Sequence, residues 1–383
     1  TYAWDFCDSD LSVLPSASLE STISASNFLG NIEVVQSSTG AWYGFGVSRD
    51  NSKIYRLSYG GSLMFSSGTA EELVISGSNV VSPYDIEVVN QGGNWYGFVA
   101  NSGGTLTKLS FGSSLSNLNV TGTSYSGLGL STPRYLEVEQ EGGNYYAVVS
   151  NFGSSKLTII NLGSDLATIT PSVQDVTITG GSGLLGLSVE KEGSTWYGLV
   201  ASFSNSKVYR VDFGSVLNDA VTADKVVDIS SKISGLDKPT DVSILGSTGV
   251  VFLQQNIATG LKRLVFGSGL GGDPVVTTVS GTPAGYSNIF GIDFAFQGTD
   301  WVGFGANFSS KSVYRVIFPK KCEVDLGSVD ITSAEPGGVK YVSSGTKYVR
   351  LTGTHSGGSK ASLLKSLEVS SGTSPDIDFS YTG

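Results

Sequence analysis

The chain has 383 residues, of which 39% are hydrophobic and only 15% are charged. That length is enough for two or three domains with sizeable cores, and the hydrophobic content excludes global disorder. The net charge of −10, from 23 basic and 33 acidic residues, argues against a nucleic-acid-binding surface. The single His excludes a multi-His metal centre, and no apolar run reaches the roughly 18 residues of a transmembrane helix.

A repeat of about 50 residues runs through most of the chain. Its clearest mark is an aromatic strand pattern that recurs six times, anchored at Trp42, Trp95, Tyr145, Trp196, Val250 and Trp301. One strand pattern precedes each copy, such as Ile32-Glu-Val-Val, and another follows it, such as Lys53-Ile-Tyr-Arg-Leu. A weaker fourth strand, such as Leu73-Val-Ile-Ser, lies between copies. These patterns and the 51 glycines predict an all-β fold, a six-bladed β-propeller over residues 1–320, with the anchor aromatics as core.

The two ends of the repeat predict how the ring closes. The sixth copy ends after its third strand, at Phe318-Pro319, whereas Ser21-Thr-Ile-Ser-Ala-Ser-Asn precedes the first copy as Val74-Ile-Ser-Gly-Ser-Asn precedes the second. We therefore expect the N-terminal segment to supply the fourth strand of the sixth blade, which removes an open sheet edge. This closure brings Cys7 and Cys322 towards each other, and we expect a disulfide between them; two separate buried thiols are the alternative.

The pattern changes after Pro319. Alternating segments such as Thr346-Lys-Tyr-Val-Arg-Leu-Thr and Ser366-Leu-Glu-Val predict a small immunoglobulin-like β-sandwich over residues 321–373. Residues 374–383 hold a linker and Asp376-Ile-Asp-Phe-Ser-Tyr, which looks like the first strand of a further unit. Because Thr1 is not an initiator methionine, we expect a processed protein or a fragment, and the chain is expected to be the front end of a longer protein.

Charged residues recur at fixed places in the repeat. The third strand of most copies carries a basic residue: Arg56, Lys108, Arg210, Arg263 and Arg315. The first strand of most copies carries an acidic residue: Glu33, Glu87, Glu137 and Asp293. They form either a charged ring along the central channel or, in the plainer interpretation, ion pairs between strands. No metal site or cofactor is expected, although Asp8 with Asp10, or Asp376 with Asp378, could hold a structural calcium. His355 is expected in a solvated loop.

One face of the propeller is expected to bind a ligand. Loops from the fourth strand of a blade to the first strand of the next share a face with loops from the second strand to the third. The former vary in length while the strands keep their register, as expected for a binding surface on a rigid scaffold. The candidate contacts are Phe28, Tyr84, Tyr125, Arg134, Phe152, Phe203, Tyr286 and Phe308. These residues suit a glycan or a protein partner, although several rings could instead pack into the tops of the blades.

The six units resemble propellers grouped with NHL- and YncE-like repeats. Tyr341-Val-Ser-Ser-Gly-Thr-Lys-Tyr-Val-Arg-Leu-Thr and Ser366-Leu-Glu-Val resemble a PKD-type domain, although the W-x-F-G-D-G motif of that family is missing. Together they resemble the head of a large Bacteroidota cell-surface adhesin, of the kind exported by the type IX system and linked to gliding motility.

This resemblance implies an extracellular, cell-surface and non-catalytic adhesion head. Its partners would be a glycan or protein ligand and the further domains or subunits of a surface fibre. The alternative is a carbohydrate-active or lyase-type enzyme that uses the central pocket of the propeller. A converging set of acidic, Arg and Tyr side chains at one mouth of the channel would favour the enzyme.

Overall fold

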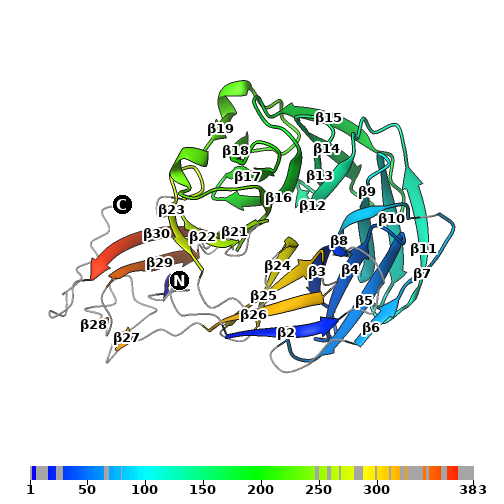
Figure 1. Cartoon of the computed structure of the whole chain (residues 1–383), viewed down its shortest axis with the longest axis horizontal. Helices are drawn as coiled ribbons and strands as arrows, with labels where there is room; N and C mark the ends of the chain where they lie inside the picture. The colour runs from blue at the N-terminus through cyan, green and yellow to red at the C-terminus, as the bar shows by residue number, and fades with distance from the viewer. Residues whose placement is uncertain are drawn as a thin grey trace.

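The computed structural model shows six β-sheets arranged in a closed ring around a central channel (Figure 1). It describes residues 2–5, 16–22, 29–63, 69–78, 80–245, 250–256, 260–266, 269–279, 288–297, 300–309, 312–319, 324–325, 340–341, 345–354 and 360–369. The predicted six-bladed propeller is confirmed. No helix in these ranges is long and apolar enough to cross a membrane.

Each blade is an antiparallel sheet whose first strand lies nearest the channel. Blade 1 is formed by β3 (Leu29–Gln36), β4 (Trp42–Ser48), β5 (Lys53–Gly60) and β6 (Thr69–Glu72). Blade 2 is formed by β8 (Pro83–Gln91), β9 (Asn94–Asn101), β10 (Thr105–Gly112) and β11 (Asn119–Tyr125). Blade 3 is formed by β12 (Pro133–Glu141), β13 (Asn144–Asn151), β14 (Lys156–Gly163) and β15 (Ser172–Thr177). Blades 4 and 5 are formed by β16 (Leu184–Glu192), β17 (Thr195–Ser202), β18 (Lys207–Gly214) and β19 (Val226–Asp228); and by β20 (Pro239–Ile244), β21 (Val250–Gln255), β22 (Leu261–Val265) and β23 (Val275–Thr278). Two short 3-10 helices, η1 (Ala223–Lys225) and η2 (Ser230–Lys232), flank β19.

The sixth blade contains strands from both parts of the chain. It is formed by β24 (Ile289–Gln297), β25 (Asp300–Asn307), β26 (Ser312–Pro319) and the N-terminal strand β2 (Ser16–Thr22). Strand β2 pairs antiparallel with β26, from Ser16 opposite Ile317 to Thr22 opposite Ser312. The predicted closure by an N-terminal strand is therefore confirmed, although the strand ends where we expected it to begin.

The same offset is seen after the first blade. Its fourth strand is β6, which ends just before the predicted Leu73-Val-Ile-Ser segment. That segment instead leaves the blade: the Leu73 amide still donates to the Ile54 carbonyl, at 2.9 Å, but the Val74 amide donates to Leu118 of blade 2, at 2.8 Å. Strand β7 (Val74–Ser76) then runs parallel to β11. These hydrogen bonds join the segment to both blades. Leu73 is buried where the chain crosses between them, whereas Val74 is exposed.

Apolar side chains between neighbouring blades form the core. The anchor residues Trp42, Trp95, Tyr145 and Trp196 are each less than 10% exposed, and Val250 is fully buried. Clusters of buried residues combine strands of adjacent blades; for example, Ile32 and Trp42 of blade 1 pack with Phe304 and Val313 of blade 6. Core packing explains these aromatic anchors, because bulky rings fill the space between blades.

The recurrent basic residues lock each blade to the next. The ion pairs seen among the described residues include none between these cations and the first-strand acids; Arg56 pairs instead with Glu71 in the fourth strand of its own blade, at 2.6 Å. Four of the five basic residues also donate to main-chain carbonyls in the third-to-fourth strand loop of the following blade. The pairs are Arg56 with Leu115 and Ser116, Lys108 with Leu166 and Ala167, Arg210 with Gly272, and Arg315 with Leu63. A long cationic side chain reaches these buried carbonyls, whose hydrogen-bonding capacity would otherwise be lost.

Beyond the propeller, the described residues form two small sheets. Strand β1 (Tyr2–Asp5) pairs with β29 (Gly345–Thr354), which pairs with β30 (Lys360–Val369), and β27 (Val324–Asp325) pairs with β28 (Lys340–Tyr341). The PKD-like sandwich stays a prediction, because much of residues 321–373 lies outside the described ranges. Also outside them are Cys7, Cys322, Asp8, Asp10, His355, Asp376 and Asp378. The disulfide and the structural calcium therefore stay predictions.

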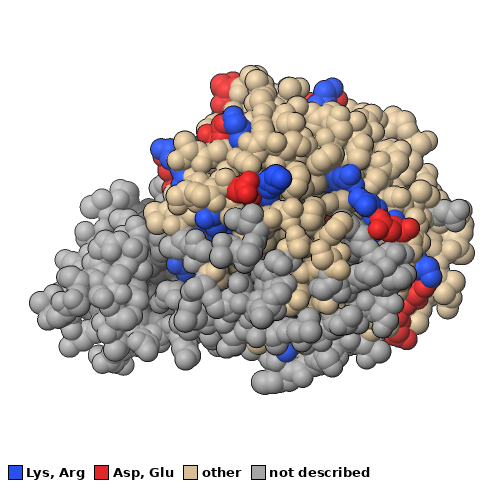
Figure 2. Space-filling view, in the orientation of Figure 1, with Lys and Arg blue, Asp and Glu red and all other residues tan. Residues whose placement is uncertain are grey.

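Charged side chains are sparse on the outside of the propeller. On the face shown in Figure 2, neutral residues make up most of the described surface, and the scattered basic residues often lie beside acidic ones. Exposed ion pairs such as Lys156–Asp175 and Lys207–Asp228 are of this kind. Such pairs contribute little to stability. The unusual electrostatics of this protein lie in the channel.

Candidate functional site: an acid-lined channel

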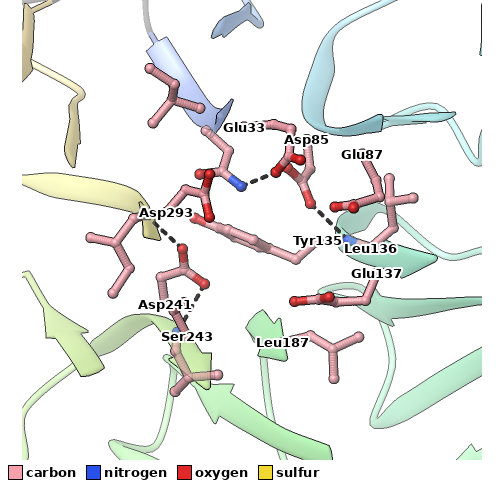
Figure 3. A pocket seen from close by; sticks show the side chains of 14 residues that line it. Glu33, Asp85, Glu87, Tyr135, Leu136, Glu137, Leu187, Asp241, Ser243 and Asp293 are labelled. Atoms are coloured by element: carbon pink, nitrogen blue, oxygen red, sulfur yellow. Dashed lines mark hydrogen bonds between the residues drawn. The ribbon is translucent and has the colours of Figure 1, made fainter. Parts of the chain in front are cut away.

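Two rings of side chains line the channel, because alternate residues of each innermost strand face inward. The first ring occupies six equivalent positions, Asn31, Asp85, Tyr135, Gly186, Asp241 and Gly291. We call it the upper ring, and we call the end of the channel nearest to it the upper end. The acid ring lies two residues further along each strand, at Glu33, Glu87, Glu137, Ser188, Ser243 and Asp293. Most of these side chains line one cavity of about 40 Å³. Six of the lining residues carry carboxyl groups: Glu33, Asp85, Glu87, Glu137, Asp241 and Asp293 (Figure 3).

Asp85 and Asp241 belong to blades 2 and 5, which lie opposite each other in the ring. Asp85 accepts hydrogen bonds from the Asn31 side chain at 2.6 Å, from the Ile86 amide at 2.8 Å and from the Leu136 amide at 2.8 Å. Each carboxylate thus bridges to the innermost strand of the next blade. Asp241 does so through the Ile292 amide, at 2.8 Å.

Burial raises the pKa of Asp85 to about 7, even though its three hydrogen bonds favour the ionised form. Burial also raises the pKa of Asp241 well above its usual range. Both carboxyl groups are almost completely buried. The Asp85 carboxyl therefore exchanges a proton close to neutral pH.

Tyr135 spans the channel between opposite blades. It begins in blade 3, and its hydroxyl donates a hydrogen bond to the main-chain carbonyl of Phe290 in blade 6. The ring lies across the middle of the pocket (Figure 3) and packs edge-on against Tyr84, with 5.8 Å between ring centroids. Burial raises its pKa well above the usual value, so the phenol stays protonated.

Two glycines complete the upper ring because their neighbours occupy the space. A Cβ atom on Gly186 would overlap the Cα and carboxylate of Asp241, and one on Gly291 would overlap the side-chain oxygen of Asn31. That oxygen, Asn31 Oδ1, is buried and has no hydrogen-bond partner. The ring thus combines four bulky polar side chains with two glycines whose Cβ positions are filled by residues of the neighbouring blades.

The acid ring below holds carboxyl groups that have no basic partner. Burial raises the pKa of Glu33, Glu87 and Glu137 well above the usual range, and the neighbouring carboxylates raise it further. Burial raises the pKa of Asp293 to about 6. Among the described residues, no ion pair involves any of the six channel carboxyls. The cluster therefore lowers its mutual repulsion by holding protons.

Metal binding has no support from the arrangement of these acids. In the part of the chain that the structure describes, no three or more His, Cys, Asp or Glu side chains are placed to hold a metal ion. The cavity is also small: at about 10–15 Å³ a molecule, it has room for about three waters. Ligand pockets are usually about 300–1,000 Å³, so a sugar cannot enter this cavity as it stands.

Cationic and aromatic side chains gather where Tyr84 and Tyr135 reach the upper end of the channel. The Arg134 guanidinium lies 4.2 Å from the ring centroid of Tyr84 and 5.0 Å from that of Phe152. It donates to the Ser102 hydroxyl at 3.0 Å. We call Tyr84, Arg134, Phe152, Phe203, Phe290 and Phe308 the mouth cluster.

Phe290 is the centre of the other half of the mouth cluster. Its ring centroid lies 5.2 Å from that of Phe308 and 6.3 Å from that of Phe203. Its main-chain carbonyl accepts the hydrogen bond from Tyr135, which links this half to the channel. Lys238 lies 5.9 Å from the Phe203 ring and is exposed, as is Phe308.

Five of the eight predicted contacts thus lie at the mouth: Tyr84, Arg134, Phe152, Phe203 and Phe308. Tyr125 does not join them, since it packs against the apolar core between blades 2 and 3. Phe28 and Tyr286 lie outside the described residues. The sequence-based analysis missed Phe290, Tyr135, Asp85 and Asp241. The two aspartates lie two residues before the recurrent first-strand positions, so the repeat could have revealed them. They are hard to recognise because glycine occupies two of the six equivalent positions.

Comparison with known proteins reports the fold alone. No family model matches the chain, and no curated protein matches it. A solved luciferin-regenerating enzyme is 12% identical, with 79% of this chain and 95% of that chain covered and a TM-score of 0.52. A GH43 β-1,3-galactosidase is 12% identical over 71% of this chain and 100% of that chain, with a TM-score of 0.49. An exo-β-1,3-galactanase from Phanerochaete chrysosporium is 11% identical over 94% of both chains, also with a TM-score of 0.49.

The expectation that the chain is not an enzyme is contradicted, because the propeller fold on which it relied is also the fold of the luciferin-regenerating enzyme and therefore does not indicate a non-catalytic protein. Nothing in this similarity supports a PKD-like domain, a Bacteroidota adhesin or type IX export. We therefore withdraw the non-catalytic interpretation. The identities are too low for any of the three activities to be transferred to this chain.

Proposed function

We propose that this propeller is a carbohydrate-active enzyme whose reaction takes place at the upper end of the channel. The observation that carries the proposal is the convergence of six carboxyl groups and the Tyr135 phenol on one cavity without a basic partner. Burying carboxyl groups without cations costs free energy, and shifted pKa values in a cleft are typical of catalytic sites. Such convergence, with Arg134 at the mouth, is what distinguishes an enzyme from a binding head.

Asp85 is the proposed general acid. Its pKa of about 7 lets it hold a proton at neutral pH and release it during a reaction, which is the condition for efficient proton transfer. Asp241 projects from the opposite blade. Most glycosidases use a pair of carboxyl groups that flank the glycosidic bond they cleave.

The size of the cavity decides where the substrate lies. Because the cavity has room only for water, the sugar ring must lie on the mouth cluster, above Tyr135. Tyr135 is only 2% exposed and crosses the pocket, so the substrate displaces this ring to reach Asp85. The small cavity below Tyr135 has room for the water that would attack the substrate.

The test is a screen of the purified protein against neutral and acidic oligosaccharides. Reducing-end release reports cleavage, and the ultraviolet absorbance of an unsaturated product distinguishes elimination from hydrolysis. We expect Asp85→Asn to lower the rate by at least about 100-fold, the lower end of general-acid effects. Asp219→Asn, which changes an exposed carboxyl far from the channel, serves as the control.

The pH profile is the second part of the test. Because Asp85 must be protonated to act as an acid, we expect the rate to fall as pH rises above about 7. A folded Asp85→Asn variant with the wild-type rate would move the chemistry off this residue. No cleavage of any oligosaccharide by the wild-type protein would refute a carbohydrate-active enzyme.

A further inference from the structure

We propose that the mouth cluster binds an acidic sugar, with the carboxylate of a uronic acid residue held by Arg134. This inference rests on the proposed function and names the substrate class for the same site. Three features of the described residues carry it: an arginine without an acidic partner, two rings that fix its plane, and a separate aromatic platform beside it.

Arg134 is a half-buried cation that no acidic side chain neutralises. Within the described part of the chain, its side chain donates to the Ser102 hydroxyl, at 3.0 Å, and its buried Nε atom has no hydrogen-bond partner. Among the described residues, no ion pair includes it. Burial lowers its pKa, and the nearby Arg49 lowers it further. Arg49 itself is paired with Asp50 at 3.0 Å. Arg134 therefore has no acidic partner among the described residues, and the exposed Lys238 beside Phe203 adds a second positive charge at the mouth.

The rings around Arg134 hold its guanidinium for recognition. Tyr84 and Phe152 lie 4.2 Å and 5.0 Å from its central carbon, and Tyr84 is itself fixed by packing against Tyr135. A guanidinium held between two rings has less freedom to move, and its planar set of donors matches a carboxylate through two parallel hydrogen bonds. Such an arrangement favours a flat, singly charged group over a phosphate, for which several cations usually gather.

The platform formed by Phe203, Phe290 and Phe308 supplies the apolar half of the site. Phe308 is 38% exposed, so part of the platform is open to solvent. Phe152, Phe203 and Phe290 all pack against the same buried cluster, which places the cation and the platform on one support. A sugar ring presents an apolar face to such rings, and its carboxylate group then reaches Arg134. A neutral sugar would leave that cation unpaired.

The experiment compares an acidic trisaccharide with its methyl ester, which has the same sugar rings and linkages but no negative charge. The probes are the α-linked trimer of galacturonic acid and the same trimer with all carboxylates converted to methyl esters, titrated calorimetrically. Binding is measured on wild-type protein and on Asp85→Asn, which is expected to lack turnover. We expect the acidic trimer to bind at least about tenfold more tightly than its ester. Arg134→Gln should remove this preference, whereas Lys225→Gln, the same charge change at an exposed outer position, should keep it.

Folding of the variants is checked by thermal melting, because Arg134 also packs between rings. Phe308→Ala changes an exposed ring and serves as the second site variant; we expect it to weaken binding of both trimers. Equal affinity for the two trimers, or a preference that a folded Arg134→Gln variant retains, would overturn the acidic-sugar inference. Binding of the acidic trimer without cleavage by the wild-type protein would leave this inference standing while counting against the enzyme.

Discussion

At the scale of single residues, the shape of the channel depends on a few positions where no larger side chain fits. Gly186 is one of them, because Asp241 of the next blade fills the space where its side chain would be. We expect Gly186→Ala to lower the free energy of unfolding by about 3 kcal/mol, the cost of forcing atoms into a packed site. Gly103→Ala is the matched control, since nothing lies near that position and its φ is not positive.

Urea unfolding of both glycine variants measures the difference. The control should stay within about 1 kcal/mol of wild type, because an added methyl group in open space changes mainly the unfolded chain. Equal destabilisation of the two variants would mean that backbone freedom, rather than contact with Asp241, explains the glycine.

The buried acids also predict how stability depends on pH. The pKa of Asp85 rises from 3.8 to about 7 on folding, so between these values the folded protein holds a proton that the unfolded chain has released. The free energy of unfolding therefore falls as pH rises through this window. We expect Asp85→Asn to reduce the loss of melting temperature between about pH 4.5 and about pH 7.5.

The control for this pH dependence is again Asp219→Asn, whose carboxyl is exposed and should leave the wild-type slope unchanged. The other channel acids, such as Asp293 with its pKa of about 6, keep part of the slope in both variants. An Asp85→Asn variant with the full wild-type slope would show that Asp85 is ionised throughout.

These residues also mark the limit of what the sequence could predict about the site. Arg134, Phe152, Phe203 and Phe308 could be found because loop position in a repeat fixes which face a residue reaches. Phe290 and Tyr135 could not, because the residue type varies from blade to blade at their rows of equivalent positions, so repetition does not single them out. What joins them is a hydrogen bond across the ring, between blades 3 and 6. Such a contact depends on the closed fold and leaves no local pattern.

At the scale of elements, the innermost strands and the third strands use different side chains to join neighbouring blades. Innermost strands use aspartates that accept from amides of the next blade, as Asp241 does from Ile292. Third strands use cations that donate to carbonyls of the next blade. Sequence repetition revealed the row of cations but not the aspartates Asp85 and Asp241, and it did not reveal which groups the cations contact in the next blade. The partners are main-chain groups, which the sequence does not display.

Lys108 shows the strength expected of a third-strand lock. Its ammonium group donates to the carbonyls of Leu166 and Ala167, both at 2.8 Å, and the residue is almost fully buried. We expect Lys108→Met to cost about 2 kcal/mol in the free energy of unfolding, because two carbonyls lose a charged donor while the apolar stem is kept. Lys156→Met, which breaks an exposed ion pair with Asp175, should cost under about 1 kcal/mol.

Urea unfolding of the two lysine variants separates a blade lock from a surface charge. The order of the two losses is the measured outcome. If Lys156→Met is the more damaging, the cations do not hold neighbouring blades together.

At the scale of the whole molecule, closure depends on β2, which pairs along β26 from residue 16 to residue 22. Without it, the last strand of the propeller would present unpaired amides and carbonyls, and such an edge recruits other chains. We expect a protein lacking residues 1–28 to melt at a lower temperature and to self-associate. Calorimetry and size-exclusion chromatography with light scattering measure the two effects.

A peptide containing residues 16–22 provides the control that assigns the effect to β2. Added in excess, it should raise the melting temperature of the shortened protein in proportion to the logarithm of its concentration, because it binds only the folded ring. A peptide of the same composition in scrambled order should not. If the shortened protein stays monomeric and melts at the wild-type temperature, the ring is held by contacts between blades alone, and β2 is a covering strand rather than the closure of the propeller.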